Sequence, residues 1–74
     1  MEQIIKEIIA EINPFDEFDI DTDLLGEGVL DSLTLMIFIE SIEKKMNIII
    51  SEDDVTMENF YSIRTIIDLL SNRE

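Results

Sequence analysis

The sequence contains no cysteine and no histidine. Their absence excludes disulfide bonds, the common zinc sites, a cysteine nucleophile, and any serine catalysis that depends on an internal imidazole. Basic residues are also few: 5 Lys and Arg stand against 18 Asp and Glu, so the formal net charge is −13. Nucleic-acid phosphates and anionic membranes would repel such a chain. We therefore expect no nucleic acid and no membrane as partners, and we expect partner proteins with basic surfaces.

Long apolar runs are absent as well. The longest, from Leu35 to Ile39, is far too short for a membrane span, and the N-terminal segment carries one cation, Lys6, among several glutamates, unlike an export signal. We therefore expect a cytoplasmic protein. The 74 residues allow one small core, and a hydrophobic content of 46% is too high for a disordered acidic tail. Residues 1–74 should thus form a single folded domain.

Two segments have the apolar periodicity of an amphipathic helix and clear local signals at their ends. In residues 2–12, isoleucines recur at helical spacing, and Asn13-Pro14 should end this helix because the residue before a proline avoids helical geometry. A second helix should begin after Asp31, whose carboxylate can cap the first turn and suits its positive dipole end. It should end just before Asn47, which can adopt the left-handed conformation common at helix C-termini.

The rest of the chain predicts one more main helix and a short one. Apolar residues at helical spacing predict a last helix over about residues 62–70, and a short turn of helix is expected over residues 57–60. Residues 48–50 are consecutive isoleucines without a partner strand, and we interpret them as a buried extended connector. The sequence therefore predicts an all-α fold, a small four-helix bundle of three main helices plus one short helix.

The predicted loop over residues 13–30 is long and apolar for a connection. It has no single period, and its apolar residues are mixed with acids. This composition favours a loop that packs over the core, with Gly26 and Gly28 as its flexible points. The aromatic residues of this loop and of the C-terminal part are expected to be core residues or loop anchors: Phe15, Phe18 and Tyr61.

The second predicted helix carries more apolar residues than burial against one core requires. One helical stripe should face the core: Leu35, Phe38, Ile39, Ile42 and Met46. A different face forms a second stripe: Leu33, Met36, Ile37 and Glu40. So small a domain cannot bury both faces, so the second stripe should be an exposed apolar patch of the kind that marks interaction sites. The alternative is that the long loop folds over this face.

A motif at the start of this helix resembles a known attachment site. The segment from Leu24 to Leu33, with two glycines before Asp31-Ser32-Leu33, resembles the signature of the acyl and peptidyl carrier protein family. In that family Asp-Ser-Leu opens the second helix, and the phosphate of 4′-phosphopantetheine esterifies the serine. The order of the predicted helices and the segment over residues 57–66 also resemble this family. The likeness therefore covers nearly the whole chain.

The resemblance implies that Ser32, flanked by Asp31 and Leu33, receives 4′-phosphopantetheine from coenzyme A. The implied partners are a phosphopantetheinyl transferase, an acyl- or aminoacyl-loading ligase, and downstream acyl-transfer enzymes of fatty-acid, polyketide or nonribosomal-peptide biosynthesis. The residues agree with a passive role, because no His or Cys can activate Ser32 and a thioester cargo needs a thiol from outside the chain. A phosphate on Ser32 should face free backbone N–H groups. We expect a monomeric carrier and not an enzyme.

The second helix departs from the pattern of fatty-acid-synthesis carriers, whose partner-facing side carries several acids. Here the positions five and twelve residues after the serine hold Ile37 and Lys44, whereas Glu43 is retained and Glu40 stands where an apolar contact is common. The pattern looks closer to stand-alone carriers that work with adenylate-forming ligases and hold amino acids or short acids. We expect partners to bind one face of this helix: Leu33, Met36, Ile37, Glu40 and Glu43.

Other interpretations compete with this one. An unmodified acidic helical interaction module would have the same charge and the same apolar patch. The alternating acids of residues 19–23 begin like a calcium-binding EF-hand loop, but Leu24 and Leu30 stand where that loop needs Gly and Glu. We predict no specific metal site there, and at most a weak, non-specific cation site. We expect some methionines to fill the core rather than to line a cavity for an acyl chain: Met36, Met46 and Met57.

Overall fold

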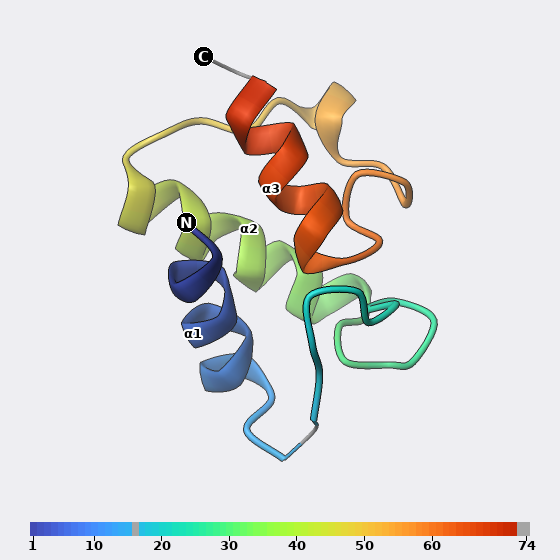
Figure 1. The fold of residues 1–74 in the computed structure, drawn as a ribbon. Helices are drawn as coiled ribbons and strands as arrows, with labels where there is room; N and C mark the ends of the chain where they lie inside the picture. Colours follow the sequence, from blue (N-terminus) through green and yellow to red (C-terminus); the bar gives the residue numbers. More distant parts are fainter. Residues whose placement is uncertain (16, 73–74) are drawn as a thin grey trace.

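All regular structure in the described residues is helical. The computed structural model describes residues 1–15 and 17–72, and Asp16 and residues 73–74 lie outside this part. Three α-helices and one 3-10 turn follow one another along the chain (Figure 1): α1 (Glu2–Ile12), α2 (Ser32–Met46), η1 (Glu52–Asp54) and α3 (Ile63–Asn72). The predicted all-α fold is confirmed, and so are the three main helices to within two residues at each end.

The two ends of α2 follow from local chemistry. The Asp31 carboxylate accepts hydrogen bonds from the Leu33 amide at 3.0 Å and the Thr34 amide at 2.9 Å, and the Thr34 hydroxyl accepts one from the Asp31 amide at 2.7 Å. This reciprocal capping box satisfies N–H groups that have no partner within the helix. At the other end Asn47 has φ 54° and ψ 51°, the predicted left-handed conformation, and its amide donates to the Glu43 carbonyl.

The short helix lies elsewhere than predicted. Residues 57–60 form a turn, in which the Phe60 amide donates to the Thr56 carbonyl at 3.1 Å, whereas the 3-10 turn is η1. The Ser51 hydroxyl accepts a hydrogen bond from the Asp53 amide at 3.2 Å, and the acids of η1 suit the N-terminal end of a helical turn. The prediction of a helix over residues 57–60 is therefore wrong, and the bundle contains three helices plus η1.

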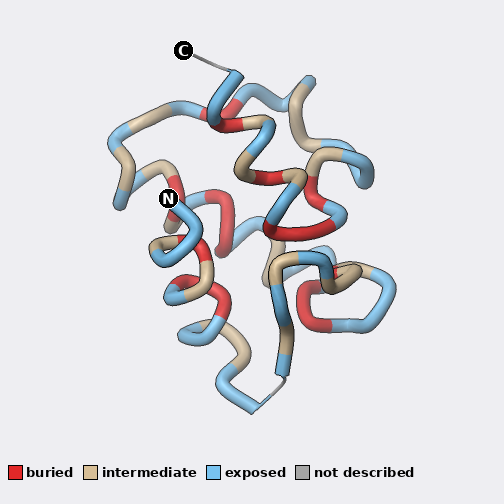
Figure 2. Tube along the Cα trace, viewed as in Figure 1, coloured by how far each residue is buried: buried red, intermediate tan, exposed pale blue. Residues whose placement is uncertain are grey.

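The core lies where α1 packs against both α2 and α3. Figure 2 shows the buried positions on the facing sides of these helices. The rings of Phe38 and Phe60 meet edge to face with centroids 6.4 Å apart, a favourable arrangement for two aromatic side chains. The predicted core stripe of α2 is confirmed, because Phe38, Ile39 and Ile42 are buried and the two end residues of the stripe pack against the core from its margin.

The long loop packs over the core, as predicted. Leu24, Val29 and Leu30 are buried in it. The Leu24 amide donates to the Tyr61 carbonyl at 2.8 Å, which fastens the loop to the segment before α3. The expectation for the aromatic residues holds for Phe18, which packs against the core, but is wrong for the side chains of Phe15 and Tyr61, which are 93% and 48% exposed. Phe15 directly follows Pro14, in the turn after the end of α1.

Two further expectations about burial need correction. Residues 48–50 are extended, but only Ile50 is buried, Ile48 packs at the core margin, and Ile49 is exposed. An extended chain directs alternate side chains to opposite sides, so three consecutive residues cannot all face the core. Core filling by the methionines is wrong for Met36 and Met57, which are exposed. Both lie outside the surface that the helices bury against one another.

Candidate functional site

Ser32 is the first residue of α2, and it is exposed. Its neighbours Asp31 and Leu33 are exposed too. Within residues 1–15 and 17–72, the Ser32 hydroxyl makes no hydrogen bond. The capping box beside it joins Asp31 and Thr34 only. The structure therefore presents the hydroxyl of Ser32 to the outside at a fixed point of the backbone.

Asp31 is the carboxylate next to Ser32, and it is poorly suited to act as a base. The hydrogen bond from the Thr34 amide, followed by those from the Thr34 hydroxyl and the Leu33 amide, holds the pKa of Asp31 below its ordinary value. A carboxylate with a lowered pKa accepts a proton less readily. Since the chain also has no histidine, neither an imidazole nor Asp31 is suited to activate the Ser32 hydroxyl.

The same capping box corrects one expectation about Ser32. A phosphate on its hydroxyl was expected to face free amides of the first turn, but the Leu33 and Thr34 amides already donate to Asp31. The carboxylate thus satisfies two of the donors that make a helix N-terminus attractive to anions. The Leu33 and Thr34 amides are therefore not free to bind a phosphate on Ser32 while they donate to Asp31.

The segment before Ser32 combines anchored and exposed positions. The Leu30 amide donates to the Leu24 carbonyl at 2.9 Å, and both side chains are buried. Between them Gly26 and Gly28 are exposed, and Gly28 has φ +77°, a conformation that favours glycine. The loop is thus fastened on either side of an exposed glycine turn that precedes Ser32.

The second face of α2 is an exposed apolar patch, as predicted. The exposed fractions of Leu33, Met36 and Ile37 are 72%, 58% and 46%, and Glu40 is exposed beside them. The alternative, in which the long loop folds over this face, is not what the structure shows. Exposed apolar patches of this kind are typical of surfaces that contact other molecules.

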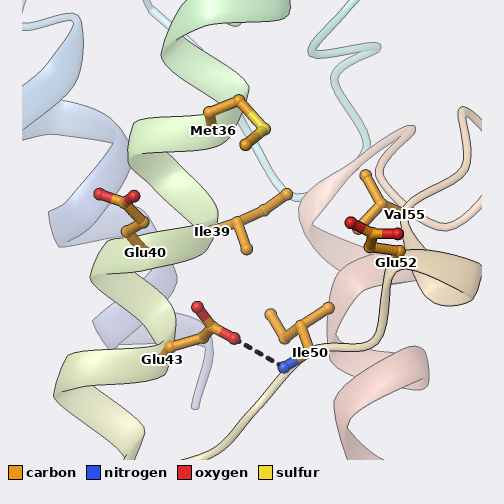
Figure 3. Close-up of a pocket in the computed structure, with 7 residues that line it drawn as sticks. All are labelled: Met36, Ile39, Glu40, Glu43, Ile50, Glu52 and Val55. Atoms are coloured by element: carbon orange, nitrogen blue, oxygen red, sulfur yellow. Dashed lines mark hydrogen bonds between the residues drawn. The ribbon is translucent and has the colours of Figure 1, made fainter.

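Glu43 has a different setting from Glu40. It is half-buried, and its carboxylate accepts a hydrogen bond from the Ile50 amide at 2.8 Å (Figure 3). This bond ties the chain segment after α2 back onto the helix. Glu43 therefore has a structural contact that the sequence did not reveal, because its partner lies seven residues away across the turn at Asn47.

A pocket of about 450 Å³ lies between α2 and the segment over residues 50–55 (Figure 3). Its lining consists of Met36, Ile39, Glu40, Glu43, Ile50, Glu52 and Val55. Sequence reasoning did not find it, because no local signal shows that the 50–55 segment returns alongside α2. Met36 lines this pocket, whereas the sequence favoured core filling for it.

The described residues show neither a metal-binding group nor a membrane-spanning helix. Nowhere in residues 1–15 and 17–72 do three or more Asp or Glu side chains gather in a way that would hold a metal ion. No helix in the same part of the chain has the length and hydropathy needed to cross a bilayer.

Comparison with known protein families gives a match over nearly the whole chain. The family model described as "Phosphopantetheine attachment site" matches residues 3–70. This range contains the long loop, Ser32 with its capping box, and the pocket. Neither the curated proteins nor the solved structures gave a match.

Proposed function

The chain belongs to the phosphopantetheine attachment-site family, and on this basis we propose that Ser32 carries the 4′-phosphopantetheine arm and that the protein shuttles acyl or aminoacyl groups between partner enzymes. Membership implies that 4′-phosphopantetheine is attached covalently. The observation that supports Ser32 as the attachment residue is its exposed hydroxyl at the first residue of a capped helix.

The other serines fit this role less well. Ser41 is half-buried in the middle of α2, and Ser62 is buried. Ser51 is exposed, but its hydroxyl caps η1. Ser71 lies beyond the matched residues 3–70. Ser32 is thus the serine within the match that combines exposure with a hydroxyl not engaged in the structure.

The residues around Ser32 fit the group. When bound, 4′-phosphopantetheine supplies the thiol for a thioester, which a chain without cysteine lacks. Ser32 would hold its phosphate, and Asp31 keeps the first turn of α2 ordered through its bonds to Leu33 and Thr34. Gly26 and Gly28 leave the approach open. None of these residues acts on the cargo, so we propose a carrier and not an enzyme.

Partner enzymes should bind beside the attachment point. The family implies contact with a phosphopantetheinyl transferase and with acyl-handling enzymes. We propose that they dock on the exposed apolar patch of Leu33, Met36 and Ile37, with Glu40 at its edge. Confining the cargo to a docked active site raises its effective concentration without a strong protein–protein affinity.

Aminoacyl transfer from an adenylate-forming ligase is the more specific form of this proposal. It is supported by the apolar character of the patch and by Lys44, which is exposed near the end of α2. Both features distinguish this helix from the acidic docking helix of carriers in fatty-acid synthesis. The cationic side chain makes a purely basic partner surface less favourable at this end of the helix.

Intact-mass measurement tests the attachment residue. The protein is incubated with coenzyme A, Mg²⁺ and a broad-specificity phosphopantetheinyl transferase. We expect the unsubstituted chain to gain one phosphopantetheine, Ser32→Ala to gain none, and the matched control Ser51→Ala to gain one. If the unsubstituted chain gains no mass, the protein is instead an unmodified interaction module. If Ser32→Ala gains the mass of one phosphopantetheine, the attachment residue is not Ser32.

A further inference from the structure

The chain forms a closed turn over residues 24–30, directly before the capped start of α2 (Figure 1). At its base the Leu30 amide donates to the Leu24 carbonyl at 2.9 Å, and both side chains are buried. Residues 26–28 form its outer part, and all three are exposed. The turn is therefore anchored in the core at its base, while its outer part faces the solvent.

Asp23 holds the outer part of this turn. Its carboxylate oxygen Oδ1 accepts a hydrogen bond from the Gly26 amide at 2.9 Å. Its backbone carbonyl accepts a hydrogen bond from the Glu27 amide, also at 2.9 Å. Asp23 is half-buried, whereas Asp19 and Asp21 in the same loop are exposed. One residue thus binds two consecutive amides of the turn.

Position 26 requires glycine because of this contact, and not because of its backbone conformation. The glycine of the turn that has a positive φ is Gly28. At Gly26 an added Cβ would lie 2.6 Å from Cγ of Asp23 and would overlap the carboxylate. Carbon atoms that are not bonded to each other prefer a separation of about 3.5–4.0 Å. A side chain at position 26 would therefore displace the Asp23 carboxylate from the Gly26 amide.

The turn lies within reach of an enzyme that modifies Ser32. Gly28 precedes Ser32 by four residues, and four residues span at most about 14 Å. A protein partner typically covers about 800 Å² of surface, which corresponds to a disc roughly 16 Å in radius. A transferase centred on the Ser32 hydroxyl therefore covers part of the exposed turn, and the shape of the turn affects how well it binds.

From these contacts we propose that Asp23 is a positioning residue for the attachment of phosphopantetheine to Ser32. It acts through the turn, because its bond to the Gly26 amide holds residues 26–28 in the conformation that the transferase binds. Without this bond only a fraction of the molecules has the turn in that conformation, and the apparent affinity falls by this fraction. The inference rests on the proposed attachment at Ser32. It gives Gly26 a role other than the flexible point expected from the sequence.

Transferase kinetics test the proposal. Initial rates of phosphopantetheine attachment are measured by intact mass over a range of carrier concentrations, with coenzyme A and Mg²⁺ in excess. Loss of one hydrogen bond changes such an equilibrium by roughly two- to tenfold. We expect Asp23→Ala to lower kcat/KM by this factor through KM, with kcat unchanged. Asp23→Asn keeps the Oδ1 acceptor and should stay within about twofold of the unsubstituted protein.

A second substitution separates this contact from a general loss of structure. Gly26→Ala displaces the carboxylate and should lower kcat/KM as much as Asp23→Ala does. The double variant Asp23→Ala/Gly26→Ala should lose no more than either single variant, because both changes remove the same bond. Asp19→Ala is the matched control, since the Asp19 carboxylate also binds a backbone amide, that of Asp21, but outside the turn. This control should leave kcat/KM unchanged.

The outcomes separate the two proposals. If the unsubstituted protein gains no phosphopantetheine, the carrier function fails and this inference fails with it. If the protein gains one and Asp23→Ala reacts equally well, the turn needs no positioning by Asp23. Losses that add up in the double variant, losses confined to kcat, or equal losses in Asp23→Asn or Asp19→Ala would show that the substitutions act in another way. Each of these last results overturns the inference and leaves the attachment at Ser32 intact.

Discussion

The carboxylate of Asp21 in the long loop pairs with the guanidinium of Arg64 in the first turn of α3. The Arg64 Nε–H donates to Asp21 Oδ1 at 2.6 Å, and an Nη2–H donates to Oδ2 at 3.2 Å. Next to this fork, the Arg64 amide donates to the Ile20 carbonyl at 3.0 Å. These contacts join residues 43 positions apart in sequence and fasten the loop that leads to Ser32 against the last helix.

Removing this ion pair should weaken the attachment of the loop. We expect Asp21→Asn to lower the melting temperature slightly, because exposed pairs contribute little, and the difference from the unsubstituted protein should shrink in about 0.5 M NaCl. Hydrogen exchange at the amides of Leu24 and Arg64 should become faster. Glu17→Gln, another exposed acid of the loop, serves as the control. Equal exchange in both variants would contradict a fastening role.

The contribution of this pair should depend on pH. The hydrogen bond from Arg64 lowers the pKa of Asp21 below its ordinary value, so the stabilisation is fully present above the pKa of the unfolded chain, near pH 4. It should disappear as the pH falls through the lower pKa of the folded state. Melting curves between about pH 2 and pH 7 should therefore show a lower melting temperature for Asp21→Asn than for the unsubstituted protein near neutral pH. At the lowest pH the two melting temperatures should agree.

Asp31 should control the stability of α2 in a similar way. Asp31→Ala removes the acceptor for the Leu33 and Thr34 amides and should lower the melting temperature clearly, whereas Asp31→Asn keeps an oxygen acceptor and should lower it less. Because hydrogen bonding lowers the pKa of Asp31, the advantage of Asp over Asn should vanish as the pH falls through the folded-state pKa. A constant difference across this range would exclude the charge as its cause.

Two adjacent residues of α2 should differ sharply in their effect on stability. Phe38 is fully buried against Phe60, so Phe38→Ala should cost about 3–5 kcal/mol, while the milder Phe38→Leu keeps the protein folded if the larger change does not. Ile37 is 46% exposed, and Ile37→Ala should change the free energy of unfolding by no more than about 0.5 kcal/mol. Denaturant titrations measure both, and comparable losses would contradict the assignment of the two faces.

The excess of acid should make the fold sensitive to ions. In the described part of the chain Glu2 and Asp21 form ion pairs, and the 18 Asp and Glu far outnumber the 5 Lys and Arg. Screening should relieve the repulsion among the others, so NaCl up to about 0.5 M should raise the melting temperature. Millimolar MgCl₂ should do so at much lower ionic strength. A melting temperature that responds to neither salt would contradict this view of mutually repelling acids.

The three main helices and the capped start of α2 at Ser32 depend on interactions that span a few residues, and the sequence alone was enough to predict them. The proline after Asn13 ends α1, the carboxylate of Asp31 begins α2, and Asn47 ends it, so each boundary follows from the chemistry of one or two neighbouring residues. Periodicity also distinguished the buried face of α2 from the exposed one, because helix geometry fixes which residues share a side.

Only the tertiary structure decided which loop residues are buried and what lies beside α2. Leu24 is buried while Phe15 is exposed, and the difference comes from packing between distant segments rather than from hydrophobicity. The pocket exists because the chain after Asn47 returns along α2 and Glu43 binds the Ile50 amide. The pairing of Asp21 with Arg64 likewise depends on the path of the whole chain. Local propensity and periodicity carry no information about such contacts, since their partners meet only after the helices have packed.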